Sequence, residues 1–334
     1  MASAIRTLLF GSAIALVIVV GMKGFADTAG SSAATTARGQ TLFGMNAPSL
    51  DALDKAESTI GARAAIVGTF ADWAHTPAFP RELAEAINER GAVPLISWEP
   101  WDSWRGGADQ PQYALRRIVA GDHDPLIDRW AAQVAEYRRP VMLRFAAEMN
   151  GDWLPWSTGV NGNRRGDYVA AWRHVRERFR RAGADNAVWV WNPINAYDGS
   201  TPLGELFPGP GQVDWMAVDG YNWGATRSWG WQTYADIFAP TVRELGDLAP
   251  RRPVMIAETG SAPDQRKAGW VTDTLRSAHA DGVAAVVWFE FAKETDWRLS
   301  DSPTTAAAAR TTLSASSWRQ GGDLAVIERA VGGR

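Results

Sequence analysis

From Thr41 onward the chain alternates short runs of apolar residues, many of them β-branched, with longer segments of mixed polarity. Eight such runs are present, centred on residues 42–45, 64–67, 93–96, 141–144, 188–191, 215–218, 254–257 and 284–288. Short continuous apolar runs are typical of parallel strands that are covered on both faces of the sheet. The pattern therefore predicts an α/β protein with eight strands.

The segments between these runs contain apolar residues at helical spacing. Five of them predict amphipathic helices, over residues 80–90, 124–138, 168–182, 231–245 and 265–280. A closed barrel and a doubly wound open sheet give the same local pattern. Eight units in a chain of 334 residues favour a single-domain (β/α)8 TIM barrel, expected over residues 41–316. The tail at 317–334 is too weakly patterned to place.

The N-terminal segment predicts export. Arg6 precedes an apolar run over residues 8–22, which is shorter than the roughly 20 residues that span a bilayer comfortably. One interpretation is a signal peptide that ends at Ala26, followed by a flexible spacer over residues 27–40. The other is an uncleaved membrane anchor. Both place the remainder of the chain outside the cytoplasm, as a secreted or cell-surface protein.

Composition excludes several classes of function. The 34 basic and 37 acidic residues leave a net charge of −3, so nothing attracts a nucleic acid. Cysteine is absent, and no two of the four histidines are three to five residues apart, so we expect no metal site built on thiolates or imidazoles. We also expect a monomer. The 18 tryptophans either fill the core or stack on sugar rings, whose C–H faces are apolar.

Reacting groups of barrel enzymes lie at the carboxyl ends of the strands. Glu148 follows the fourth predicted strand and Glu258 lies at the end of the seventh. A retaining glycosidase needs one carboxylic acid and one carboxylate about 5–5.5 Å apart. The sequence thus predicts Glu148 as general acid/base and Glu258 as nucleophile, although a single glutamate in such a place more often caps a helix or forms an ion pair.

Other residues at the strand ends are candidates for supporting roles. Tyr221 is expected to donate a hydrogen bond to Glu258, and Arg144 to keep that carboxyl ionised. Trp156 is a candidate sugar platform, and Asp219, Glu290 and Asp296 are further acids at the same rim. The predicted substrate-binding residues are Trp98, Glu99, Trp101, Arg144, Asn150, Trp153, Tyr221, Trp223 and Trp288.

Four motifs resemble those of glycoside hydrolase family 26. The run from Arg144 to Gly151, with Trp153 behind it, is similar to the family's acid/base motif, and residues 256–260 to its nucleophile motif. Residues 219–221 and the segment 288–298 resemble its sixth-strand and eighth-strand motifs. The resemblance covers about Thr41 to Leu299. It implies a retaining, endo-acting enzyme on β-1,4-mannan or mixed-linkage β-1,3-1,4-glucan, with no cofactor.

One position departs from the family pattern. Family mannanases usually have a histidine immediately before the acid/base glutamate, whereas this chain has Ala147. The departure makes mannan less favoured, and segments 97–101 and 288–298 look closer to glucan-active and uncharacterised bacterial members. Two other hypotheses stay open: a non-catalytic carbohydrate-binding protein on a degenerate barrel, and a membrane-anchored accessory hydrolase of exopolysaccharide synthesis.

Overall fold

The computed structural model describes residues 39–332. The candidate signal peptide or anchor at residues 8–22 lies outside the described residues, as does nearly all of the predicted spacer. Between residues 39 and 332 no helix combines the length and apolar character needed to cross a membrane.

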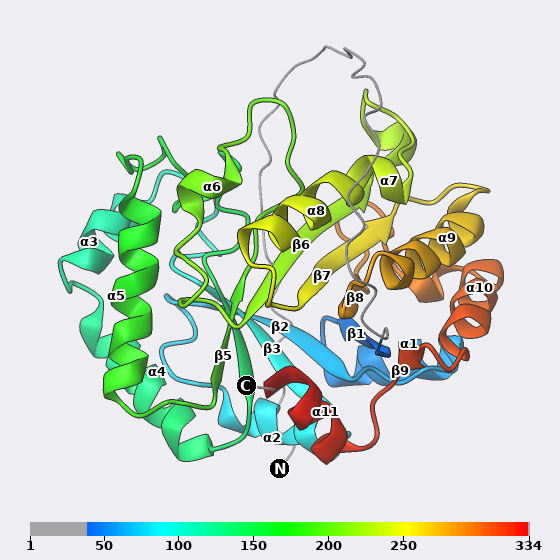
Figure 1. Ribbon diagram of the computed structural model, residues 1–334, viewed down its shortest axis with the longest axis horizontal. Coiled ribbons are helices and arrows are strands. Elements are labelled where there is room, and N and C mark those ends of the chain that lie inside the picture. Colours follow the sequence, from blue (N-terminus) through cyan, green and yellow to red (C-terminus); the bar gives the residue numbers. More distant parts are fainter. Residues whose placement is uncertain (1–38, 333–334) are drawn as a thin grey trace.

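The structure contains all eight predicted strands (Figure 1). They are β1 (Thr41–Asn46), β2 (Ile66–Asp72), β3 (Val93–Glu99), β4 (Val141–Phe145), β5 (Ala187–Trp191), β6 (Trp215–Asn222), β7 (Val254–Ser261) and β8 (Ala285–Phe289). Each pairs in parallel with its neighbours in chain order. β1 also pairs with β8, so that Leu42 lies opposite Ala285, and with β2, so that Gly44 lies opposite Ile66. This closure confirms the barrel and excludes the open sheet.

Helices surround the ring of strands, with α3 to α5 on one side of Figure 1 and α9 and α10 on the other. They are α1 (Leu50–Ile60), α2 (Arg81–Glu89), α3 (Leu115–Val119), α4 (Asp124–Tyr137), α5 (Asp167–Arg181), α6 (Leu203–Leu206), α7 (Tyr234–Ile237), α8 (Ala239–Leu248), α9 (Lys267–Ala280), α10 (Pro303–Leu313) and α11 (Leu324–Gly332). The single helix predicted over residues 231–245 is wrong. Pro240 lies in the first turn of α8, where its missing N–H is tolerated, and a new helix begins there.

The amino-terminal end of the barrel is filled by apolar side chains and closed by the tail that the sequence left unplaced. Trp318–Arg319 forms a short strand, β9, beside β1, and α11 follows it. Ile327 and Val331 of α11 pack against the interior cluster, and the Trp215 indole donates a hydrogen bond of 2.9 Å to the Val331 carbonyl. The tail is thus the floor of the barrel.

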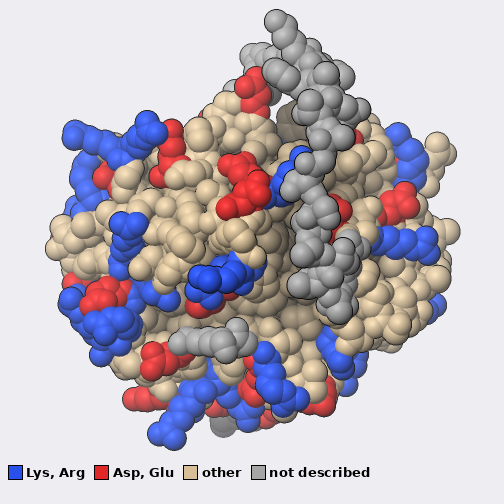
Figure 2. Space-filling view, viewed as in Figure 1, with Lys and Arg blue, Asp and Glu red and all other residues tan. Residues whose placement is uncertain are grey.

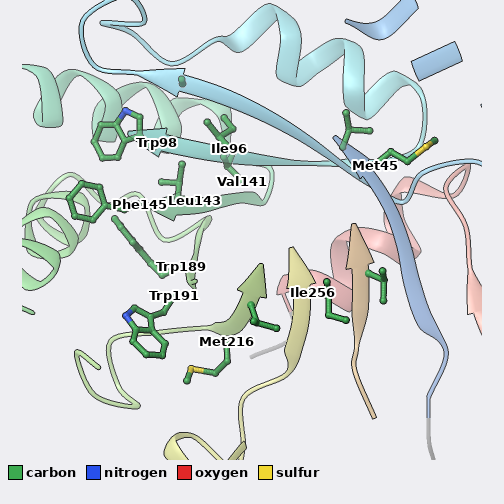
Figure 3. Close-up of a cluster of buried hydrophobic side chains, with 14 of the residues drawn as sticks. Met45, Ile96, Trp98, Val141, Leu143, Phe145, Trp189, Trp191, Met216 and Ile256 are labelled. Carbon is green, nitrogen blue, oxygen red and sulfur yellow. The ribbon is translucent and has the colours of Figure 1, made fainter. Parts of the chain in front are cut away.

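Alternate side chains on each strand point away from the barrel axis toward the helices. Figure 3 shows this outer layer, in which Trp98 of β3 and Phe145 of β4 project toward the helices beside the barrel. Trp98 packs on Trp130 of α4 and Phe179 of α5, with ring centroids 4.9 and 5.6 Å away. Its indole therefore belongs to the layer between strands and helices.

Charged side chains of both signs are interspersed on the face shown in Figure 2. Neither sign forms a continuous field there, which agrees with the net charge of −3. The view therefore offers no long basic surface of the kind that follows a nucleic acid backbone.

Candidate active site

The carboxyl end of the barrel interior is polar, in contrast to its floor. Leu143 and Phe145 face the outer layer, so Arg144 between them points inward. The buried polar side chains around it come from the ends of neighbouring strands: Asn46, Ser97, Asn192, Asp219 and Glu258. Alternation along the strands thus gathers the polar groups into one cluster.

Arg144 is the centre of this cluster and is only 2% exposed. Its Nε donates to the Ser97 hydroxyl at 3.0 Å, and its Nη1 forms an ion pair with Asp219 at 2.9 Å and a hydrogen bond to Asn192 at 3.3 Å. Its Nη2 forms an ion pair with Glu258. One planar guanidinium therefore ties β3, β4, β6, β7 and the end of β5 together.

Both oxygens of Glu258 are held by hydrogen-bond donors. Arg144 binds Oε1, and the Tyr221 hydroxyl donates to Oε2 at 2.6 Å. These are the contacts that the sequence predicted for Tyr221 and Arg144. A charge-assisted hydrogen bond on one oxygen and a phenolic donor on the other set the orientation of this carboxyl. Glu258 is 7% exposed, so it is oriented yet not sealed from solvent.

Glu148 lies on a constrained turn directly after β4. Ala146 and Glu148 have φ values of 47° and 56°, a left-handed conformation that is uncommon outside glycine. The Glu148 N–H donates to the Asn192 carbonyl at 2.7 Å, and the Trp153 indole donates to Oε2 at 3.1 Å. The backbone hydrogen bond and the indole contact both set the direction of this half-buried carboxyl.

The two carboxyls influence one another electrostatically. Burial, followed by the negative charge of Glu258, raises the pKa of Glu148 to about 7 against the opposing effects of Arg144 and Trp153. Glu148 can therefore release and regain a proton near neutral pH, while both oxygens of Glu258 are bound by donors. Two carboxyls with opposite environments are the arrangement that acid/base and nucleophilic roles require.

Glu99 is a third carboxyl of this region. It lies at the end of β3, where the Trp101 indole donates to it at 3.0 Å. Burial raises the pKa of Glu99 to about 7 in spite of the Arg144 charge and the Trp101 hydrogen bond, which oppose the shift. Trp101 is 5% exposed, so it braces Glu99 and does not present a ring face to a ligand, contrary to the sugar-binding prediction.

Three other predicted substrate-binding residues are corrected by their burial. Trp98 and Trp288 are 0% exposed; the first packs in the outer layer and the second donates to the Trp297 carbonyl at 2.9 Å. Asn150 is 1% exposed and exchanges two hydrogen bonds with the backbone of Ile194. Its amide joins the loops after β4 and β5, and both its oxygen and its nitrogen already have a hydrogen-bond partner within the protein.

Two further residues have structural positions. Trp156 is 1% exposed and donates to the Ala147 carbonyl at 2.7 Å, so it supports the turn that carries Glu148. Glu290 is 3% exposed and accepts hydrogen bonds from the N–H groups of Leu299 and Ser300. Its carboxyl holds the segment after β8 and is not offered to a ligand.

Trp153, Tyr221 and Trp223 are half-buried, and thus retain accessible surface. Trp153 lies beside Tyr197, with ring centroids 6.2 Å apart and planes inclined by 24°. Trp223 meets Trp297 edge-on at 4.7 Å, and the Arg227 guanidinium lies 4.2 Å from its centroid. Of the predicted tryptophans, Trp153 and Trp223 remain available to a sugar ring.

The predicted site residues came from the ends of the third to eighth strands, and residues on the first two strands were missed. Asn46 ends β1 and lies in the polar cluster. Phe70 of β2 lies 6.0 Å from the Arg144 guanidinium and makes edge contacts with Phe289 and Phe291. The signal was present, because the barrel prediction implies that all eight strand ends meet at one rim.

The sequence of this chain matches a known protein family and is similar to several known proteins. Residues 101–271 match the family described as "Glycosyl hydrolase family 26". "Endoglucanase H" of Acetivibrio thermocellus is 36% identical over 279 residues, which are 81% of this chain and 30% of that protein. "Beta-1,3-xylanase TXYA" of a Vibrio species is 28% identical over 187 residues, 53% of this chain and 36% of that protein. The chain thus spans about a third of the length of these relatives.

A solved structure supports the fold independently. The β-mannanase BoMan26A of Bacteroides ovatus superposes with a TM-score of 0.63 at 18% identity, covering 86% of this chain and 92% of that one. At this identity the likeness concerns the barrel alone, which it confirms.

Proposed function

Because the chain belongs to glycosyl hydrolase family 26 and is therefore an O-glycosyl hydrolase, we propose that it cleaves internal β-1,4 linkages of a polysaccharide with retention of configuration. Glu148 is the general acid/base and Glu258 the nucleophile. The observation that carries this proposal is the contrast between the two carboxyls: Arg144 and Tyr221 bind both oxygens of Glu258 and orient it, whereas burial raises the pKa of Glu148 so that it can supply a proton near neutral pH.

Two displacements then follow. In the first, a Glu258 oxygen attacks the anomeric carbon while Glu148 gives its proton to the departing glycosidic oxygen, so the bond to the leaving sugar breaks as the glycosyl–enzyme ester forms. In the second, Glu148, now a carboxylate, takes a proton from water, and the water oxygen displaces Glu258 from the same carbon. The proton balance closes, because Glu148 ends protonated and Glu258 ends ionised.

Within this class we favour a β-glucan over a mannan as the substrate. Two observations support that choice: the 36% identity to a protein named an endoglucanase, and Ala147 in place of the mannanase histidine. Release of oligosaccharides from mixed-linkage glucan, cellulose, mannan and xylan, measured in parallel, tests it. Mannan as the preferred polymer would contradict the choice of glucan while leaving the proposed mechanism intact.

The mechanism is tested by replacing each carboxyl. Glu258→Ala should lower kcat more than about a thousandfold, because no covalent intermediate can form. With an activated aryl β-glycoside and azide, that variant should release the α-glycosyl azide, since one displacement inverts the anomeric centre. Glu148→Ala should lower kcat about 10²–10⁴-fold on natural substrates. With azide it should give the β-azide, since two displacements retain the configuration.

Glu290→Gln is the matched control. It removes a carboxyl that is also buried at the same end of the barrel but binds the backbone of Leu299 and Ser300. Hydrolysis should persist in this variant. Full activity of Glu258→Ala, or binding of polysaccharide by the wild-type protein without any turnover, would contradict the catalytic assignment and favour a carbohydrate-binding role.

We further propose that the enzyme acts outside the cytoplasm as a monomer, on the strength of the apolar segment at residues 8–22 and the net charge. Cell fractionation and the N-terminal sequence of the recovered protein distinguish two forms. A cleaved form would begin near Asp27, and an anchored form would stay with membranes, as an accessory hydrolase would. Recovery from the cytoplasm with the intact N-terminus would contradict export.

A further inference from the structure

An exposed tryptophan lies in the loop that follows β3. Trp104 is 61% exposed, more than any other large hydrophobic side chain in residues 39–332. A single exposed apolar side chain is ordinary on a protein surface. Trp104 is unusual because the side chains around it hold it in one position.

His75 supports one face of the indole. The two rings are 3.8 Å apart between centroids and inclined by only 19°. The ring Nδ1 of His75 lies 3.0 Å from both oxygens of Asp72. The backbone N–H of His75 also donates a hydrogen bond of 2.6 Å to Asp72. Because Asp72 is 2% exposed, it provides a rigid anchor for the imidazole.

The backbone beneath the indole is held by Asp72 and by a second acid, Asp102. The Asp102 carboxylate accepts hydrogen bonds of 3.1 Å from the N–H groups of Trp104 and Arg105. The Ser103 hydroxyl donates to Asp72. Ring and backbone are therefore both positioned before any ligand arrives, which lowers the entropy lost on binding. His75 is the only ring stacked on Trp104 in the described part of the chain, so the opposite indole face is open.

This assembly lies on the same rim as the catalytic pair. Asp72 ends β2 and is paired with Glu99 at the end of β3, next to β4, after which Glu148 follows. The charges of Asp72 and of Glu258 both act on the carboxyl of Glu99. Trp104, in the loop held by Asp72, therefore lies beside the ends of β2 and β3 at the rim that carries the catalytic pair.

We propose that Trp104 is a stacking platform for a hexosyl unit of the substrate chain that lies beyond the units flanking the scissile bond. The proposal rests on the proposed function. The apolar C–H face of a β-linked hexose matches a flat indole, while its hydroxyls remain at the ring edge, free for water. His75 and Asp72 are positioning residues, because they act on the sugar only through the indole.

The test compares long and short ligands. Trp104→Ala should weaken binding of a β-glucan hexasaccharide about tenfold, equivalent to about 1.4 kcal/mol, and leave a trisaccharide unchanged. Isothermal titration calorimetry in the Glu258→Gln background measures this binding whether or not the protein turns substrate over, with mannohexaose and mannotriose run in parallel. Trp104→Phe should restore part of the affinity. His75→Ala should weaken hexasaccharide binding by a smaller factor, because the indole stays but is no longer held.

Trp229→Ala is the matched control. Trp229 is 53% exposed, and none of the described residues stacks a ring on it. Equal losses in the Trp104 and Trp229 variants would overturn the platform, and so would unchanged hexasaccharide affinity in Trp104→Ala or failure of both hexasaccharides to bind. An absence of hydrolysis by the wild-type enzyme together with a selective loss in Trp104→Ala would instead reject the proposed reaction and keep the platform.

Discussion

At the scale of single residues, the two carboxyls differ because their neighbours differ. Glu258 receives hydrogen bonds from a cation and a phenol, whereas Glu148 receives one from an indole and is otherwise desolvated. The first environment fixes the orientation of the carboxyl, and the second opposes its negative charge. Their chemical roles follow from these contacts, since both residues are glutamates.

The pKa of Glu148 predicts the alkaline limb of activity. Its carboxyl must be protonated to act as acid, so kcat/KM should fall as the pH rises through about 7. The Trp153 indole stabilises the charged form and lowers this pKa, so Trp153→Phe should move the limb to higher pH. The pH dependence of kcat/KM measures the shift.

Two comparisons make this prediction sharper. Trp223→Phe removes an indole that is not bonded to Glu148 and should leave the limb in place. Glu258→Gln removes the negative charge that raises the Glu148 pKa, so a carboxyl NMR titration of that inactive variant should show a lower value. A limb that stays fixed in Trp153→Phe would contradict the role of the indole.

At the scale of elements, Arg144 connects strands that are not adjacent in the sheet. Backbone hydrogen bonds join each strand only to its immediate neighbours. Its guanidinium reaches Ser97 on β3, Asp219 on β6 and Glu258 on β7. Buried ion pairs of this kind contribute geometry, because desolvation offsets much of their attraction. The network therefore orients the nucleophile. Removing Arg144 would leave the buried carboxyls of Asp219 and Glu258 without a cation.

Arg144→Met should lower the free energy of unfolding by about 3–5 kcal/mol, because Asp219 and Glu258 stay buried without their cation. Arg144→Lys keeps the charge but cannot form the same fork of hydrogen bonds, so it should lose less stability and still lose most activity. Urea unfolding followed by tryptophan fluorescence, with kcat measured alongside, checks both. Wild-type kcat in Arg144→Lys would show that charge alone orients Glu258.

At the scale of the whole molecule, the barrel separates chemistry from stability. The polar cluster lies at the carboxyl ends of the strands, while α11 closes the opposite end with Ile327 and Val331. Substitutions at the floor are then expected to change folding without changing the reaction.

Ile327→Ala tests this separation. Ile327 is 0% exposed, so its truncation should lower the free energy of unfolding by about 2–5 kcal/mol through lost burial and a cavity. Under conditions where the protein stays folded, kcat and KM should remain close to wild type. Thermal unfolding and steady-state kinetics on one preparation give both quantities. A large fall in kcat without loss of stability would show that the floor is coupled to the catalytic end.

Sequence periodicity predicted the strands well but could not distinguish the two faces of a strand. Both faces of a strand are covered in a closed barrel, so the apolar pattern did not show that Trp98, just after one run, faces the helices while Arg144, at the end of another, faces the axis. Trp288 and Asn150 were predicted to contact a ligand for a similar reason. The sequence does not show whether an indole or an amide at a strand end is already hydrogen-bonded within the protein or is accessible to a ligand.

The sequence by itself determined the eight strand units and placed Glu148 and Glu258 at strand ends, because strand periodicity is a local pattern that is repeated eight times; the closure of the strands into a ring was decided by the pairing of β1 with β8 and β2. Only the tertiary structure decided which tryptophans are open, that Asn150 joins two loops, that the tail is a floor and that His75 supports Trp104. Those facts depend on contacts between residues far apart in the chain, and such contacts exist only after the ring of strands has closed.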